Sequence, residues 1–359
     1  MSYDAGNPGR SRRPSALWPV LWAVLCVLGL AGWWSCASGP DPDRAWRALL
    51  INFVYFSGLA TGLVVWPAAT ILSRGKWAGP LERTALAGVT FAPFSIAAFA
   101  ALWIGRTHWA DWMNEELPAI SVWLNSPSLF MRDGIALVLL WALAVWFVLW
   151  AGHRGRKVLA GWFALTFCMV WSLLAFDLVM ALDPHWVSTL FGAYFFITNL
   201  YIGMAAWTFL ALLLHPPGDR GTRQDDLGKL IVAFSLASTY MMFSQLLPIW
   251  YENLGHEVRF VIPRLRFAPW RWVSLGLLMT VYLGPLVLLL TRWSKKTSWY
   301  LGAMAMMVLV GMWIERWWLI APTLGGACRL GGAEGSITTA FVGALALGIC
   351  LFRRGDAKS

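Results

Sequence analysis

Long apolar runs alternate with short polar segments along almost the whole chain. Each of ten runs has roughly the length that a helix needs to cross a membrane. They cover about residues 16–36, 47–72, 84–105, 133–151, 158–182, 187–214, 228–251, 272–291, 298–321 and 336–352. Helices are expected because lipid offers no partner to unpaired backbone groups, and the runs lack the alternation of barrel strands. The pattern predicts an all-α integral membrane protein with about ten transmembrane helices.

Composition agrees with this prediction. Hydrophobic residues make up 59% of the chain and charged residues only 13%, which is too little polar surface for a water-soluble globule of 359 residues. The net charge of +10 is typical of a membrane protein whose cytoplasmic loops are basic. Nucleic acid binding is not expected, because no basic face interleaved with stacking aromatics lies outside the runs.

The basic residues are distributed unequally between the two ends of the predicted helices. Lys and Arg occur in threes at six places on the side that holds both termini, whereas the other side carries arginines and no lysine. This bias predicts cytoplasmic tails at 1–15 and 353–359 around one membrane domain at 16–352. The clearest exception is segment 259–271, which holds four arginines on the outer side. It is either a solvated, headgroup-level loop or a docking site for an extramembrane partner.

A weak internal repeat appears when residues 49–66 are aligned with 190–207. Leu49 then matches Leu190, and Gly62 matches Gly203. The offset covers four helices, which predicts two similarly oriented four-helix bundles, at about 46–182 and 187–321, with the first and tenth helices outside them. Gly58 and Gly62 form a small-x-x-x-small pair that permits close helix packing.

The chain lacks the usual signatures of redox cofactors and metals. Its five cysteines are scattered without a C-x-x-C pair, which argues against an iron–sulfur cluster or a covalent haem. The five histidines do not form the facing pairs that a membrane cytochrome needs, and no Walker loop, G-x-G-x-x-G or H-E-x-x-H motif occurs. We therefore expect no cofactor or metal bound by this chain.

Carboxylates are the remaining candidates for chemistry, and they gather in the predicted outer half of the membrane. Asp177 lies about two turns inside the outer end of its run, and Asp183 lies at that end, before Pro184. Ionisable groups inside a membrane are costly and therefore often functional. The candidates for a proton pathway are Asp177, Asp183, His185, Glu252, Glu315, Arg316 and Asp133.

Two interpretations of these acids stay open. In the structural one, Asp183 and Glu252 are interfacial, Glu315 pairs with Arg316 or Arg132, and Asp133 is a first-turn acid that complements the helix dipole. Asp177 fits this interpretation least well. In the functional one, the acids line a proton half-channel or the polar end of a quinone pocket. Asp177 and Asp183 are separated by about 600° around an ideal helix, so a relay between them needs water or another residue.

The polar seam also carries a family resemblance. Segment 177–192, DLVMALDPHWVSTLFG, is similar to the D-x-x-M-S-L-D/E-P-x-W-x-S-T-x-x-G signature of NrfD-like membrane subunits, specifically the ActF type of alternative complex III. Segment 250–254, WYENL, followed by arginines, is similar to a Y-x-N-L/I-P-E-E motif of that family. Here Gly255 and His256 stand where the family shows Pro and Glu, so that only Glu257 of the acidic pair is present.

The resemblance implies a cofactor-free, ten-helix subunit in a bacterial inner membrane, within a quinol:cytochrome c or electron-acceptor oxidoreductase. It implies a sister NrfD-like subunit, an iron–sulfur subunit and haem c subunits as partners, the last two carrying the cofactors. Our leading hypothesis is a subunit that supports quinol oxidation and conducts protons through a periplasm-facing half-channel. The alternatives are a purely structural anchor of the complex and an independent transporter. Whether a quinone enters this chain stays open.

Overall fold

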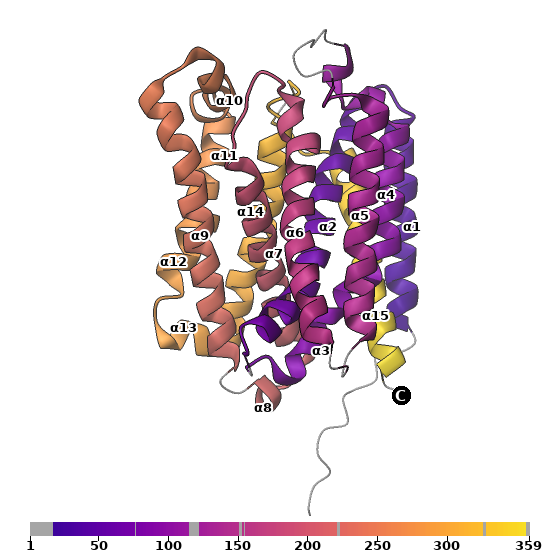
Figure 1. Ribbon diagram of the computed structural model, residues 1–359, viewed down its shortest axis with the longest axis vertical. Coiled ribbons are helices and arrows are strands. Elements are labelled where there is room, and N and C mark those ends of the chain that lie inside the picture. The colour runs from indigo at the N-terminus through magenta and orange to yellow at the C-terminus, as the bar shows by residue number, and fades with distance from the viewer. Residues whose placement is uncertain are drawn as a thin grey trace, which may run out of the picture.

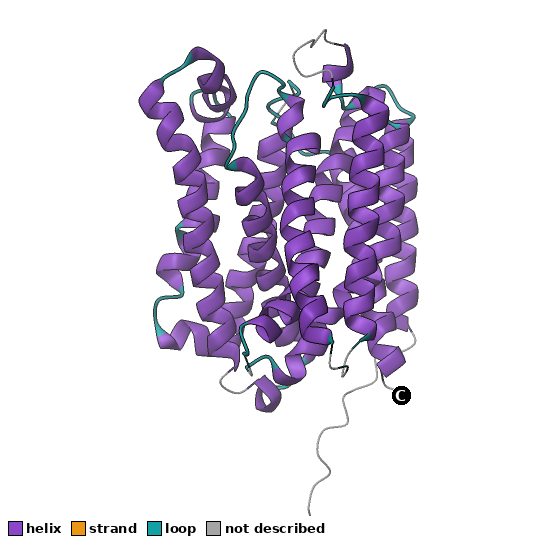
Figure 2. Cartoon of the chain, viewed as in Figure 1, coloured by secondary structure: helices purple, strands orange, loops and turns teal. Residues whose placement is uncertain are grey.

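The computed structural model describes residues 17–75, 77–114, 122–150, 153, 155–220, 223–325 and 328–356. Helices dominate these residues, which contain no strand (Figure 2). Within the described residues, ten helical segments are long and apolar enough to cross a membrane. The chain is therefore an all-α, multi-pass integral membrane protein, as the hydrophobic pattern predicts.

The spans follow one another in an antiparallel bundle (Figure 1). Eight are single helices: α1 (Leu17–Ala37), α2 (Pro42–Leu72), α5 (Ser126–Leu149), α6 (Arg156–Leu178), α7 (Phe191–Leu214), α9 (Arg223–Glu252), α14 (Ser298–Ile320) and α15 (Gly332–Asp356). The third is assembled from η1 (Gly79–Leu81), α3 (Glu82–Leu86), η2 (Ala87–Phe91) and α4 (Ala92–Ile104), and the eighth from α11 (Trp270–Leu277), η6 (Leu278–Tyr282) and α12 (Gly284–Leu288).

Short helices lie at the two ends of the bundle. They are η3 (Arg106–His108), η4 (Asp111–Asn114), η5 (Met180–Leu182), α8 (Pro217–Arg220), α10 (Gly255–Leu265) and α13 (Arg292–Lys296). We call the end that carries α10 the upper end and the end that carries α8 the lower end, as drawn in Figure 1. The even number of spans places the start of α1 and the end of α15 together at the lower end.

Helix α2 lies at the centre of the protein and is buried along its apolar length. It packs against α7, α6, α4, α14 and α15. Its crossing with α7 is very close, because a Cβ atom added to Gly203 would lie 2.5 Å from the carbonyl carbon of Gly62. Gly58 likewise leaves room for the side chain of Asn199 on α7. The glycines that match in the repeat alignment therefore meet at the interface between α2 and α7.

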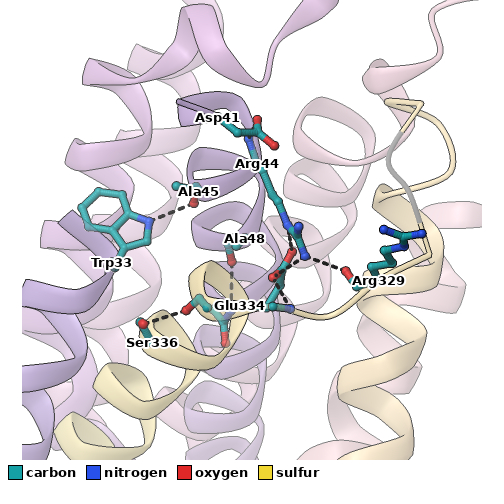
Figure 3. A network of polar contacts seen from close by, with 11 residues as sticks. Trp33, Asp41, Arg44, Ala45, Ala48, Arg329, Glu334 and Ser336 are labelled. Carbon is teal, nitrogen blue, oxygen red and sulfur yellow. Dashed lines mark hydrogen bonds and ion pairs between the residues drawn. The ribbon is translucent and has the colours of Figure 1, made fainter. Parts of the chain in front are cut away.

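The remaining contacts group the helices around this crossing. Helices α2, α4, α5 and α6 pack on one side, and α7, α9, α12 and α14 on the other. Helices α1 and α15 form a tight antiparallel pair against α2. At the upper end, Arg44 of α2 binds Glu334 of α15 with N–O distances of 2.8 and 3.0 Å, and Trp33 of α1 donates to Ala45 O (Figure 3).

Some expected boundaries differ from the structure. The fourth span was expected to begin near Asp133, but α5 begins at Ser126. Pro127 at the start of α5 fixes a helical φ angle where a missing N–H does no harm, so the polar segment before residue 133 is already helical. Asp133 is therefore not a first-turn acid, and its carboxyl lies deeper along the helix than the sequence suggested.

Candidate functional site

Asp177 is completely buried near the upper end of α6, and it is ion-paired. Arg132 of α5 donates to Asp177 Oδ2 from Nε at 2.9 Å and from Nη2 at 2.5 Å. The indole N–H of Trp123 donates to Asp177 Oδ1 at 2.7 Å, and the Arg132 guanidinium lies 4.0 Å from the Trp123 ring centroid. This arrangement explains how the span accommodates a buried carboxyl group.

Asp133 is the acid that this arrangement leaves without a hydrogen-bond donor. It is completely buried, and no donor among the described residues hydrogen-bonds to either of its oxygens. Arg132 Nε is 4.0 Å from Asp133 Oδ1, beyond hydrogen-bond range. The Asp133 and Asp177 carboxyls are close enough for one, when protonated, to donate to the other. Two carboxyls that share a single guanidinium balance its charge when they also share one proton.

A second buried cluster lies between α7 and α14. Glu315 and Arg316 are both fully buried, and Arg316 Nη1 donates to Glu315 Oε2 at 2.7 Å. Arg316 Nη2 donates to Thr198 Oγ1 at 2.7 Å and to Asn199 Oδ1 at 3.0 Å. The guanidinium also lies 3.9 Å from the Phe195 ring centroid. Of the two partners considered for Glu315, the structure selects Arg316, because Arg132 is bound to Asp177.

Tyrosines extend this second cluster toward α9 and η6. The Tyr194 hydroxyl donates to Glu315 Oε1 and lies 2.9 Å from the Tyr282 hydroxyl. Tyr282 ends η6, a π-helical turn closed by the bond from Leu283 N to Leu278 O. Its carbonyl accepts from Ser235 Oγ at 2.6 Å, and Tyr201 donates to Val281 O at 3.0 Å. Side chains from α7 and α9 thus satisfy the backbone groups that a π turn displaces.

A cavity of about 490 Å³ lies beside these tyrosines, between α7, α9, α10, α11, η6 and α14. Tyr194 and Tyr282 form part of its wall, and most of the other lining side chains are apolar. Phe260 of α10 covers it from the upper end and stacks on Trp186, with ring centroids 3.9 Å apart.

Arg264 holds α10 in this position. It is 1% exposed, and it donates to Trp318 O at 3.1 Å and to Leu319 O at 2.7 Å. These carbonyls belong to the last turn of α14, so the guanidinium caps that helix and complements its dipole. Burial lowers the pKa of Arg264 to about 9, while the nearby Asp183 carboxylate acts in the opposite direction. The side chain remains protonated at neutral pH.

The other predicted candidates lie toward the upper end of the bundle. Asp183 is buried, with an Oδ2–Nε distance of 3.6 Å to Arg259, and its Oδ1 has no hydrogen-bond donor among the described residues. His185 and Glu252 are exposed. Asp183, His185 and Glu252 are therefore not members of either buried cluster, whereas Asp177 and Asp133 come together in one and Glu315 and Arg316 in the other.

Sequence reasoning missed several members of these sites. Trp123 and Tyr282 were not singled out, and Arg132 was considered only as a partner of Glu315. An arginine directly before a buried aspartate, Arg132–Asp133, was an available signal for a compensated charge. No local signal marked Tyr282, because aromatic residues are frequent throughout the spans.

A scan against protein-family models and a search of curated proteins found no match to this chain. Among the described residues, no group of three or more His, Cys, Asp or Glu side chains is arranged to hold a metal ion. The fold and its two buried charge clusters define the chain as a polytopic helical membrane protein with ionisable groups inside its spans.

Proposed function

We propose that this chain is a membrane subunit of a bacterial quinol-oxidising respiratory complex, and that it conducts protons between the Asp133–Asp177 pair and the periplasm. The observation that carries the proposal is Asp133, a buried carboxyl in a membrane span without a hydrogen-bond donor among the described residues. A group in this state readily exchanges between holding a proton and passing it to a neighbouring carboxylate. The similarity of segment 177–192 to NrfD-like subunits supports the choice of complex.

The surroundings of the pair suggest a route to the upper surface. The Arg132 side chain is 23% exposed and the Trp123 residue is 50% exposed, so the cluster is accessible from outside the protein through these two residues, whereas both carboxyls are buried. A proton that enters the pair weakens the bond between Asp177 and Arg132, because a neutral carboxyl attracts the guanidinium less strongly. The proton then leaves toward the upper surface past the Arg132 side chain.

Orientation follows from the charges. Arginines dominate the basic residues of the upper end, and the lysines of the described residues lie toward the lower end, which we assign to the cytoplasm under the positive-inside rule. The acids at the upper end then face the periplasm, where the proposed iron–sulfur and haem c subunits would dock. The similarity of segment 177–192 to NrfD-like subunits also leads us to propose that this membrane is the bacterial inner membrane.

Replacement of Asp133 or Asp177 by Asn in the assembled complex tests the proton pathway. We expect quinol:acceptor turnover and proton release to fall together in both variants, while Glu252→Gln, at an exposed position, serves as the matched control. Normal turnover and proton release in both Asn variants would refute the pathway.

The two alternatives predict different results. If the chain is a purely structural anchor, an Asn variant should lower turnover only when the complex fails to assemble. The haem-to-protein ratio of the purified complex measures its assembly. An independent transporter predicts that the tagged chain purifies without haem-containing partners.

A further inference from the structure

The cavity of about 490 Å³ has the size of a ligand pocket, and most of the polar groups in its lining are already hydrogen-bonded; the indole N–H of Trp186, a buried group, has no partner among the described residues. The Tyr194 and Tyr282 hydroxyls bond to Glu315 and to each other. Thr239 donates to Ser235 O at 2.7 Å, and Gln245 donates to Met241 O at 3.4 Å. Apart from any bond to the Trp186 N–H, a ligand with a polar ring would have to break existing hydrogen bonds, whereas a hydrocarbon chain would not.

Ser274 and Arg264, which also line the cavity, are hydrogen-bonded as well. Ser274 donates to Arg264 O at 2.7 Å and accepts from the Trp318 indole at 2.8 Å. The donors of Arg264 reach carbonyls of α10 and α14 and the Thr323 hydroxyl. The interior of the cavity is thus largely apolar, although several polar residues line it.

The cavity opens sideways between α9 and α11. Phe243 of α9 and Leu275 and Leu278 of the eighth span line it, and these side chains are 58%, 43% and 41% exposed. Exposed apolar residues on transmembrane helices face lipid, so the opening leads into the hydrocarbon layer rather than into water.

One lining residue has an unsatisfied charge, and it lies at the rim. Arg271 begins the eighth span at the upper end, is exposed and contacts the Trp272 ring at 5.0 Å from its centroid. Among the described residues, no carboxylate forms an ion pair with Arg271. Exposed Phe267 and Trp272 flank it, and this combination of arginine and aromatic residues is typical of the headgroup level of a bilayer.

We propose that the cavity binds one acyl chain of an anionic phospholipid, with the phosphate on Arg271 at the rim. Apolar walls accept the chain, the lateral opening admits it from the bilayer, and the unpaired guanidinium selects a negatively charged head. The lipid seals the space beneath α10 next to the Tyr194–Glu315 cluster. This proposal does not depend on the respiratory role of the chain.

Native mass spectrometry of the full-length protein, purified from membranes and titrated with lipid, tests this site. Phosphatidylglycerol and phosphatidylcholine with identical acyl chains are the two probes. We expect the protein to retain one phosphatidylglycerol and to prefer it to phosphatidylcholine. Arg271→Gln should weaken phosphatidylglycerol binding about fivefold, as expected for one basic group at the headgroup level. Arg266→Gln, on the same segment but outside the cavity, should have no such effect.

A second pair of variants probes the interior of the cavity. Leu246→Trp places a bulky indole ring inside the cavity and should abolish retention of both lipids. Leu247→Trp, on the exposed face of α9, should leave retention unchanged. If Leu246→Trp does not fold, the phosphatidylglycerol binding of Arg271→Gln relative to Arg266→Gln tests the proposal on its own. Equal retention of the two lipids, equal effects of the two Arg variants, or a quinone retained in place of the phospholipid would each overturn the proposal. Capture of a soluble protein by segment 259–271, with no lipid retained, would also overturn it.

Discussion

The ion pair between Arg132 and Asp177 offers the sharpest test of the buried charges. Arg132→Met leaves Asp177, at 0% exposure, with Trp123 as its remaining hydrogen-bond donor among the described residues. Loss of one partner of a buried pair costs about 3–5 kcal/mol of unfolding free energy. Because the Arg132 side chain is 23% exposed, water can partly solvate the stranded carboxylate. We therefore expect a loss of about 3 kcal/mol, at the lower end of that range.

A double-mutant cycle measures the interaction energy between Arg132 and Asp177 separately from their contacts with other residues. Asp177→Leu alone leaves a partly exposed guanidinium that lies 4.0 Å from Asp133, so its cost should be smaller than that of Arg132→Met. The double variant Arg132→Met/Asp177→Leu removes both charges and should be more stable than Arg132→Met, because an apolar pair leaves no buried charge. The coupling energy should fall within about 0.5–3 kcal/mol.

Asp133 provides the matched control for this cycle. Because no donor among the described residues bonds to its oxygens, and an Asn amide can still donate to Asp177, Asp133→Asn should change the unfolding free energy by less than about 1 kcal/mol. Unfolding of each variant in mixed micelles by titration with dodecyl sulfate measures these values. The reasoning is refuted by a stable Arg132→Met variant, or by an Asp133→Asn variant that loses as much stability as Arg132→Met.

Three further predictions concern the helix crossing, the tyrosines and the α14 cap. Gly203→Ala should cost about 1–3 kcal/mol, because its Cβ meets backbone, while Gly276→Ala, with nothing within 4 Å, should not destabilise the same unfolding transition. Tyr194→Phe removes the donor to a buried carboxylate and should cost about 1.5–3 kcal/mol, more than Tyr282→Phe in the same assay. Arg264→Lys should increase proteolysis of α10, because an ammonium cannot span the carbonyls that the guanidinium binds; unchanged cleavage would contradict its capping role.

Much of the fold could be predicted from the order of residues. Apolar run length determines whether a helix crosses a membrane, and this local property correctly predicted ten spans. The small residues Gly58 and Gly62 also indicated close packing, and the structure places them at the crossing of α2 and α7, against Asn199 and Gly203. Boundaries were less accurate, as at α5, because polar residues such as Arg132 and Asp133 interrupt the hydrophobic pattern although the helix continues through them.

The sequence by itself determined that this protein is helical, membrane-embedded and provided with acids near one end of its spans. It did not determine which acids are paired. Asp177 was the candidate hardest to explain, yet Arg132 and Trp123 compensate it; Asp133 was assigned to a helix terminus, yet it is the buried carboxyl without a donor. Pairing depends on which faces of α5, α6, α7 and α14 meet. Helices in lipid select these faces through packing and interhelical hydrogen bonds that join residues distant in sequence, so only the tertiary structure could decide it.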